Sequence, residues 1–241
     1  SDMWNFYVST WLSVEGRCLC RGCGGHTTAP WCRGLWLSEG GQSATGRLLD
    51  HIIDTHPATA SLRARTPHMH VVTYLNELLN SLANSAGLDS VDLLTKDLHV
   101  WPDHHGNRSP LADPTLRGMV SGLSLSCDEK DLALLYLATV QALAYGTRHI
   151  IESLESAGHR RMDCVLLCGG LSKNPLFMAD TSDSGVGRPV LVPQRTEAVL
   201  SDSAVQRYWR RTQPGYTLTG GSCECNGRSG RMLCLQHQSY Q

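Results

Sequence analysis

The clearest pattern along the chain is a run of apolar residues at helical spacing in residues 71–86. Apolar side chains recur there every three or four positions, and Gly87 follows as a stop signal. These positions are Val71, Leu75, Leu78, Leu79, Leu82 and Ala86. The spacing predicts an amphipathic helix that buries one face against the rest of the domain.

A second and longer helix is predicted to begin after Asp128. Aspartate is a favourable N-cap, and Glu129 and Asp131 follow where the helix dipole favours negative charge. A stripe of apolar and small residues continues as far as Leu154, and Gly158 supplies the C-terminal stop. The pattern therefore predicts one long helix in this region.

A short, mostly apolar run at residues 163–168 ends at Gly169 and Gly170. A run of this length bounded by glycines predicts a strand buried in a sheet. Residues 99–110 are rich in turn-forming residues, which predicts a loop. Because strands alternate with helices, the expected fold class is α/β.

The two ends of the chain lack this regularity. Residues 1–34 and 201–241 are rich in Cys, Trp, Arg, Gly and Ser and show neither helical nor strand period. We therefore expect an irregular segment at 1–34, one folded domain at 35–200, and an unrelated, disordered tail at 201–241.

Charge and hydropathy exclude two classes of partner. The formal net charge of -1 argues against binding to nucleic acid, which calls for a basic face. No apolar run reaches the roughly 18 residues of a membrane span, and the N-terminal residues do not resemble a signal peptide. We therefore expect no nucleic-acid or membrane partner and a cytoplasmic location.

The ten cysteines are concentrated at the two ends rather than spread through the fold that disulfides would staple. This distribution favours a reduced protein. Two groups of Cys and His suit zinc chemically but lack paired spacing at a useful separation, so zinc is kept as an alternative. The groups are Cys18, Cys20, Cys23, His26 and Cys32, and Cys223, Cys225, Cys234 and His237.

The most informative motif is the turn that follows the predicted strand. Gly169 and Gly170 lead through Ser172 to Asn174, and Pro175 suits the first turn of a helix. Glycines at the end of a strand let a ligand approach the backbone, and strand ends are where open α/β sheets place ligands. The structural alternative is a tight strand-to-helix turn in which Asn174 is only the N-cap.

This motif and several others resemble the FGGY family of carbohydrate kinases, in particular its eukaryotic, ribulokinase-like branch. The segments that carry the resemblance are residues 39–46, 97–103, 106–113, 118–123 and 138–141. The resemblance implies an actin-like (ribonuclease H-like) fold and the C-terminal domain of a two-domain sugar kinase. It also implies that Gly169, Gly170, Ser172 and Asn174 line the adenosine side of a site for ATP, used with Mg²⁺.

The family's N-terminal domain, with its Asp-x-Gly-Thr phosphate loop and catalytic Asp, has no counterpart in this sequence. No catalytic residue and no metal ligand is therefore assigned here. The resemblance implies an ATP-dependent kinase for a sugar such as the ketopentose D-ribulose, represented by its C-terminal domain. The alternative is a catalytically inactive remnant or isoform, and residues 18–33 are interpreted as out-of-frame translation.

Overall fold

The computed structural model describes residues 4–12, 20, 23–28, 36–159, 161–162, 164–167, 170–181, 186–188, 190–191 and 232–239. It contains a six-stranded mixed sheet in the order β2-β3-β1-β8-β6-β7. The strands are β1 (Trp4–Leu12), β2 (Gly24–Thr28), β3 (Trp36–Gln42), β6 (Cys164–Leu167), β7 (Val190–Leu191) and β8 (Met232–Ser239). Strand β1 pairs antiparallel with β3 and β8, whereas β6 is parallel to β7 and β8.

Three of these strands lie near the ends of the chain. β1 and β2 lie within residues 1–34, which were expected to be irregular, and β8 lies within the tail expected to be disordered. β1 and β8 are stabilised by pairing between opposite ends of the sequence, as Trp4 pairs with Ser239. Local periodicity does not encode such a partner, because strand formation depends strongly on context.

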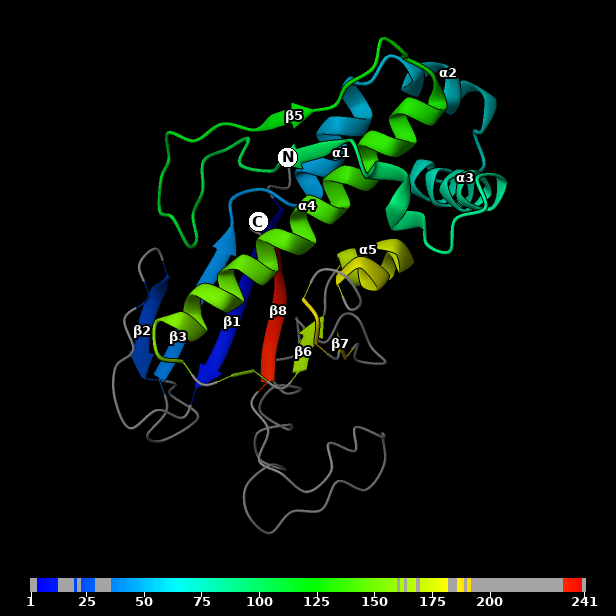
Figure 1. Cartoon of the computed structure of the whole chain (residues 1–241). Helices are drawn as coiled ribbons and strands as arrows, with labels where there is room; N and C mark the ends of the chain where they lie inside the picture. Colours follow the sequence, from blue (N-terminus) through cyan, green and yellow to red (C-terminus); the bar gives the residue numbers. More distant parts are fainter. Residues whose placement is uncertain are drawn as a thin grey trace.

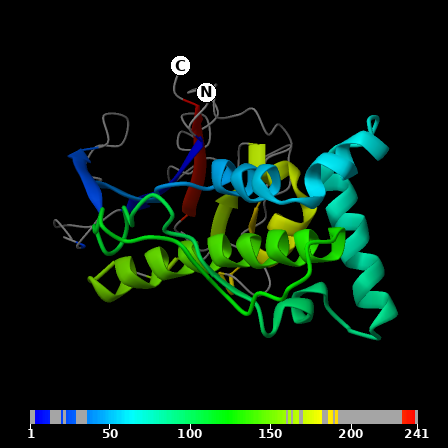
Figure 2. The ribbon, with the colours of Figure 1, turned by 90° about the horizontal axis from the view of Figure 1, so that it is seen from above.

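The helices lie on and beside this sheet (Figures 1 and 2). They are α1 (Gly46–Thr55), α2 (Ala58–Arg65), α3 (Val71–Ser85), α4 (Glu129–Ser156) and α5 (Pro175–Asp180), with 3-10 turns η1 (Val91–Thr95) and η2 (Gly170–Lys173). Helix α4 runs diagonally over the sheet and contacts β3, whereas α2 and α3 lie beyond the sheet, around the N-terminal end of α4. The core is built around α4, where Leu132, Tyr136 and Leu143 have no exposed surface.

Both predicted helices are confirmed with their caps. Helix α3 buries Leu75 and Leu79, and the chain leaves it through Gly87, whose φ of +63° favours glycine. Asp128 caps α4 by accepting a hydrogen bond from the Asp131 backbone N–H at 2.8 Å. The strand predicted at 163–168 is confirmed over its described residues as β6.

The loop predicted at residues 99–110 is corrected at its start. Residues His99–Trp101 form strand β4, which pairs antiparallel with β5 (Met119–Ser121) in a separate two-stranded sheet. The partner lies about twenty residues away and each strand has three residues, so the local sequence carries almost no strand signal. The remainder of the segment is a turn-rich loop in which Asp103 accepts hydrogen bonds from the Trp101 and Asn107 side chains.

Small residues allow α4 to pack closely on β3. A Cβ added at Gly40 would lie 2.8 Å from the Ile150 side chain, and one at Gly146 would lie 2.8 Å from the Gln42 side chain. The Gln42 amide donates to the Leu143 carbonyl at 2.8 Å and to the Thr147 hydroxyl at 3.0 Å. These contacts fix the helix on the sheet through residues of the 39–46 segment.

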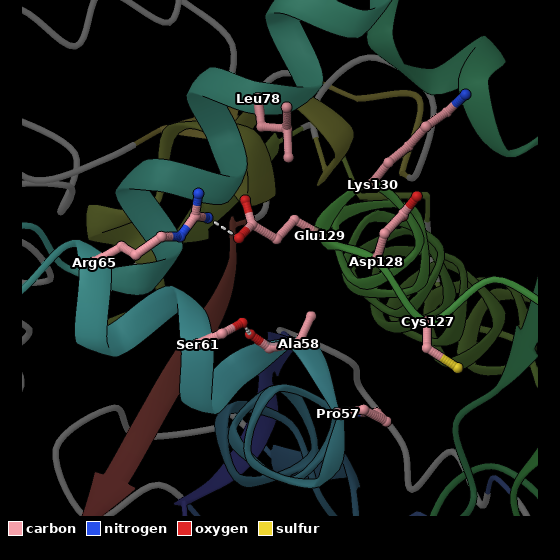
Figure 3. A pocket seen from close by; sticks show the side chains of 9 residues that line it. All are labelled: Pro57, Ala58, Ser61, Arg65, Leu78, Cys127, Asp128, Glu129 and Lys130. Carbon is pink, nitrogen blue, oxygen red and sulfur yellow. Dashed lines mark hydrogen bonds and ion pairs between the residues drawn. The ribbon is translucent and has the colours of Figure 1, made fainter.

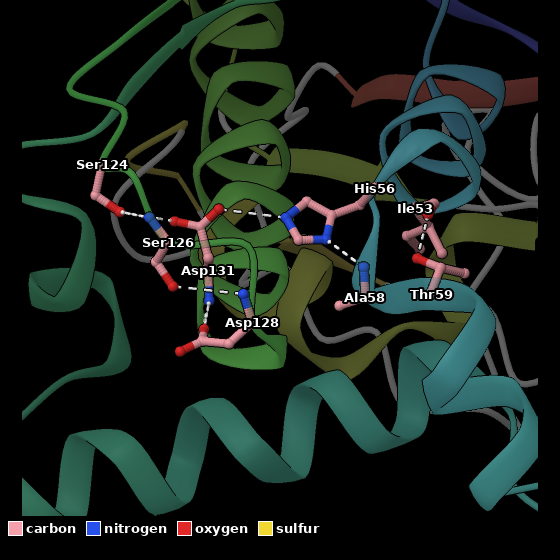
Figure 4. A network of polar contacts seen from close by, with 8 residues as sticks. All are labelled: Ile53, His56, Ala58, Thr59, Ser124, Ser126, Asp128 and Asp131. Carbon is pink, nitrogen blue, oxygen red and sulfur yellow. Dashed lines mark hydrogen bonds and ion pairs between the residues drawn. The ribbon is translucent and has the colours of Figure 1, made fainter.

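A polar network ties the N-terminal end of α4 to the junction of α1 and α2 (Figure 4). The backbone N–H of Ala58 donates to His56 Nδ1 at 3.2 Å, so the ring hydrogen lies on Nε2 and donates to Asp131 at 3.2 Å. Ser124 donates to the other oxygen of the same carboxylate at 3.3 Å.

Among the residues described, no helix combines the length and hydropathy needed to cross a membrane.

Candidate functional site

The site predicted from the sequence lies where β6 leads into α5. Gly170 begins η2 and is exposed, Ser172 is 3% exposed, and Asn174 is the N-cap of α5, with Pro175 as the first helical residue. Gly169 lies outside the described residues. The structure therefore confirms the strand-to-helix turn and its cap, and it places three of the four predicted residues together.

The side chain of Asn174 is held in one orientation by three hydrogen bonds. Its Oδ1 accepts from the Leu176 backbone N–H at 3.2 Å, which is the capping bond. Its Nδ2 donates to the hydroxyl oxygen of Tyr136 at 2.7 Å. Tyr136 is fully buried in α4, and burial raises the pKa of its hydroxyl far above the usual value, so the group remains a neutral phenol.

The third bond to Asn174 comes from Asn76 on helix α3, a residue that the sequence analysis did not single out. Asn76 Nδ2 donates to Asn174 Oδ1 at 3.0 Å. The Oδ1 atom of Asn76 is buried and has no hydrogen-bond partner within the described part of the chain. The two asparagines therefore connect three elements, α3, α4 and α5, and leave one acceptor unused.

A groove of about 660 Å³ opens beside Asn76, whereas Gly170, Ser172 and Asn174 are not among the residues that line it. Its walls come from α3, from the segment that joins α3 to η1, and from the η2–α5 turn. The lining residues are Thr73, Asn76, Glu77, Asn80, Asp89, Ser90, Val91, Asp92, Lys173, Pro175, Leu176 and Ala179. This volume lies within the usual range for small-molecule sites.

The wall formed by η1 is anchored to the long helix. The Thr95 hydroxyl and the Gln141 Oε1 atom are hydrogen-bonded at 2.6 Å, and Gln141 Nε2 donates to the Asp92 carbonyl at 3.2 Å. Both Thr95 and Gln141 are buried. The elements that bound the groove therefore all pack against α4.

The groove carries charges of both signs on separate elements. Glu77 and Asp89 are exposed on and after α3, Asp92 is half-buried in η1, and Lys173 is exposed on η2. Carboxylates suit the hydroxyl and amino donors of a nucleoside, whereas a lysine suits an anionic group. With the unused acceptor of Asn76, these residues fit the nucleoside end of a nucleotide better than its phosphates.

A second pocket, of about 560 Å³, lies on the other side of α3 between α2 and the N-terminal end of α4 (Figure 3). Its main polar groups already pair with one another. Arg65 forms an ion pair with Glu129, whose other carboxylate oxygen accepts from the Tyr74 hydroxyl at 2.6 Å. The Ser61 hydroxyl donates to the Ala58 carbonyl at 2.9 Å.

The zinc alternative is tested only in part. Cys20 and Cys23 are buried cysteines outside any disulfide, and burial together with a hydrogen bond to Cys20 raises the pKa of Cys23 to about 12. Cys18, Cys32, Cys223 and Cys225 lie outside the described residues. Within the described ranges, no three His, Cys, Asp or Glu residues are grouped to hold a metal ion.

Comparisons with known proteins agree with this architecture. Residues 21–205 match the model of the FGGY family of carbohydrate kinases, C-terminal domain. An FGGY carbohydrate kinase domain-containing protein of Homo sapiens is 53% identical over 174 residues, which cover 71% of this chain and 31% of that protein. A D-ribulokinase of Saccharomyces cerevisiae is 39% identical over 170 residues, which cover 70% of this chain and 24% of that protein.

A similar fold is found among solved structures. The crystal structure of xylulose kinase from Bifidobacterium adolescentis aligns with a TM-score of 0.54 and 22% identity. The alignment covers 90% of this chain and 38% of that enzyme. The fold is thus that of these sugar kinases, the actin-like ATPase fold, and the chain spans about a third of the length of the relatives that it matches.

Proposed function

The chain belongs to the FGGY family of carbohydrate kinases, and we propose that it forms the nucleotide-binding part of an ATP-dependent sugar kinase. In this proposal ATP lies in the groove between α3 and the η2–α5 turn. The observation that carries the proposal is the coincidence of two independent features at one place. The motif at residues 169–174 was singled out from sequence, and Lys173 of this segment lines a ligand-sized groove together with Pro175, which follows it.

Each predicted residue has a distinct part in this proposal. Gly170, which has no side chain, leaves the backbone of the turn accessible to the ribose or base. Ser172 is buried and Asn174 is fixed by its three hydrogen bonds, so both shape the turn. Gly169 is placed in the same role by its position in the motif. Lys173 is exposed at the groove and is the described cation best placed to meet phosphate.

Bound ATP supplies the phosphoryl group that the reaction transfers. The chain's own residues bind the nucleoside, orient it and exclude water from one side of it. Mg²⁺ is proposed to enter with the phosphates, because catalysis of phosphoryl transfer rests on positioning and charge neutralisation. The described residues provide no cluster of three metal ligands that would hold the ion by themselves.

For the acceptor we propose a sugar, and within that class a ketopentose such as D-ribulose. Support comes from the yeast relative named D-ribulokinase, which is 39% identical in the matched region. That match covers 24% of the yeast protein, so residues that select the sugar can lie in parts of the relative outside it. A cytoplasmic location is proposed with the same function.

A second candidate is that the 241-residue chain by itself transfers no phosphate. The coverage favours it, because the human relative has more than two thirds of its length outside the match. Phosphoryl transfer requires both substrates to be held in one geometry, and the groove proposed here accounts for the nucleotide alone. Turnover of D-ribulose and Mg·ATP by the purified chain alone would contradict this candidate.

The nucleotide assignment is tested by substituting Gly170. Gly170→Asp adds a bulky carboxylate at the turn, and we expect ATP binding measured by titration calorimetry to weaken at least about tenfold. Asn84→Asp is the matched control, since it adds the same charge at an exposed position of α3 that does not line the groove. Equal ATP affinity in the wild type and Gly170→Asp would remove the assignment.

A further inference from the structure

The acceptor atom of Asn76 is the least explained feature of the groove. A buried polar atom without a partner is unfavourable, and such atoms are uncommon in folded proteins. Asn76 lines the groove from α3, and its Oδ1 has no partner within the described residues. A ligand that donates a hydrogen bond to this atom would relieve the deficit.

The orientation of the Asn76 amide follows from a chain of fixed groups. The buried Tyr136 hydroxyl accepts from Asn174 Nδ2, which turns Asn174 Oδ1 toward the backbone N–H of Leu176. That oxygen therefore accepts, and the atom of Asn76 facing it must be the nitrogen. The amide of Asn76 consequently presents oxygen, not nitrogen, as its remaining group.

We propose that Asn76 is a specificity-determining residue of the nucleotide site and that its Oδ1 accepts a hydrogen bond from the 6-amino group of adenine. This inference rests on the proposed function and deepens it. Adenine carries an amino donor at ring position 6, whereas guanine and hypoxanthine carry an oxygen acceptor there. A fixed acceptor in the protein forms a hydrogen bond with adenine and repels guanine and hypoxanthine.

Burial strengthens this discrimination. Because the Oδ1 atom is shielded from solvent, water does not compete for it, and an oxygen brought against it would leave both acceptors unpaired.

The test compares ATP with inosine triphosphate, which carries oxygen in place of the amino group at position 6. Titration calorimetry of the full 241-residue chain should give at least about tenfold tighter binding of ATP. Asn76→Leu keeps the approximate shape, removes the acceptor and should bring the ratio of the two affinities close to one. The change should come mainly from weaker ATP binding.

The matched control is Asn80→Leu. Asn80 lies one turn further along α3, lines the same groove and is exposed, so the same substitution there should leave the ratio unchanged. Urea unfolding of each variant checks that the fold is retained. Because Asn174 keeps its bonds to Leu176 and Tyr136, the turn should survive the loss of Asn76.

The outcomes separate this inference from the proposed function. If the wild type binds neither nucleotide, the nucleotide assignment itself is wrong. If the wild type binds both equally, or if Asn76→Leu keeps the preference for ATP, the groove still binds nucleotides but Asn76 does not select the base. Loss of preference in Asn76→Leu together with its retention in Asn80→Leu supports the inference.

Discussion

The two cavities on either side of α3 are of similar size but differ in how their polar groups are satisfied. The groove beside α5 has a volume of about 660 Å³ and the pocket beside α2 about 560 Å³. In the pocket, Arg65, Glu129 and Tyr74 pair with one another, so the polar groups stabilise the protein itself. In the groove, the hydrogen bonds between side chains end at Asn76, whose Oδ1 has no partner among the described residues.

This difference is a better guide to function than volume. A cavity whose polar groups are mutually paired offers a ligand little beyond apolar contact, and binding there would require breaking existing bonds. A cavity with a fixed, unpaired and buried acceptor gains free energy when a donor arrives. The comparison also shows why α3 matters, because this helix contributes to both cavities through opposite faces.

The largest effect on stability and on ATP binding is expected from removing one hydroxyl on the groove side. Tyr136→Phe deletes the acceptor for Asn174 Nδ2 in a fully buried position, so the free energy of unfolding should fall by about 1–3 kcal/mol. The released Asn174 amide should also orient Asn76 less well and weaken ATP binding severalfold. Urea unfolding and titration calorimetry measure the two effects.

Tyr74→Phe makes the same chemical change on the pocket side and serves as the control. It deletes the hydroxyl that donates to Glu129, a half-buried carboxylate that water can then solvate. Stability should fall by about 1 kcal/mol and ATP affinity should stay unchanged. If Tyr74→Phe weakens ATP binding as much as Tyr136→Phe does, the distinction between the two cavities fails.

The smallest effect on stability is expected from removing the ion pair that spans the pocket. The Arg65 side chain is 60% exposed, so solvent screens its attraction to Glu129. Arg65→Ala should therefore lower the free energy of unfolding by at most about 1 kcal/mol in urea titrations. A loss of more than about 2 kcal/mol would mean that this pair, rather than apolar packing, holds α2 against α4.

The parts of the fold that the sequence predicted are those with local signals. Helices α3 and α4 follow from periodicity and caps, and Asn174 and Pro175 mark the start of α5 by position alone. Strands β1, β4 and β8 were not predicted because each depends on a partner distant in sequence. A three-residue strand such as β4 has too few residues to show alternation.

The residues of the candidate site also differ in whether the sequence could predict them. The glycine turn and Asn174 carry a motif that can be read along the chain, whereas Asn76 lies 98 residues away from Asn174. In the sequence Asn76 is one polar position on the outer side of an amphipathic helix, where solvent exposure is the ordinary expectation. Its role emerges only when tertiary packing brings α3 against the η2–α5 turn.

The most direct test of the account is hydrogen exchange of the full chain with and without ATP, read by mass spectrometry. Binding in the groove predicts slower exchange in residues 73–80, 89–92 and 170–179, and unchanged exchange in residues 57–65 around the pocket. Protection confined to the pocket segment, or no protection at saturating ATP, would contradict the claim that the groove between α3 and α5 is the nucleotide site.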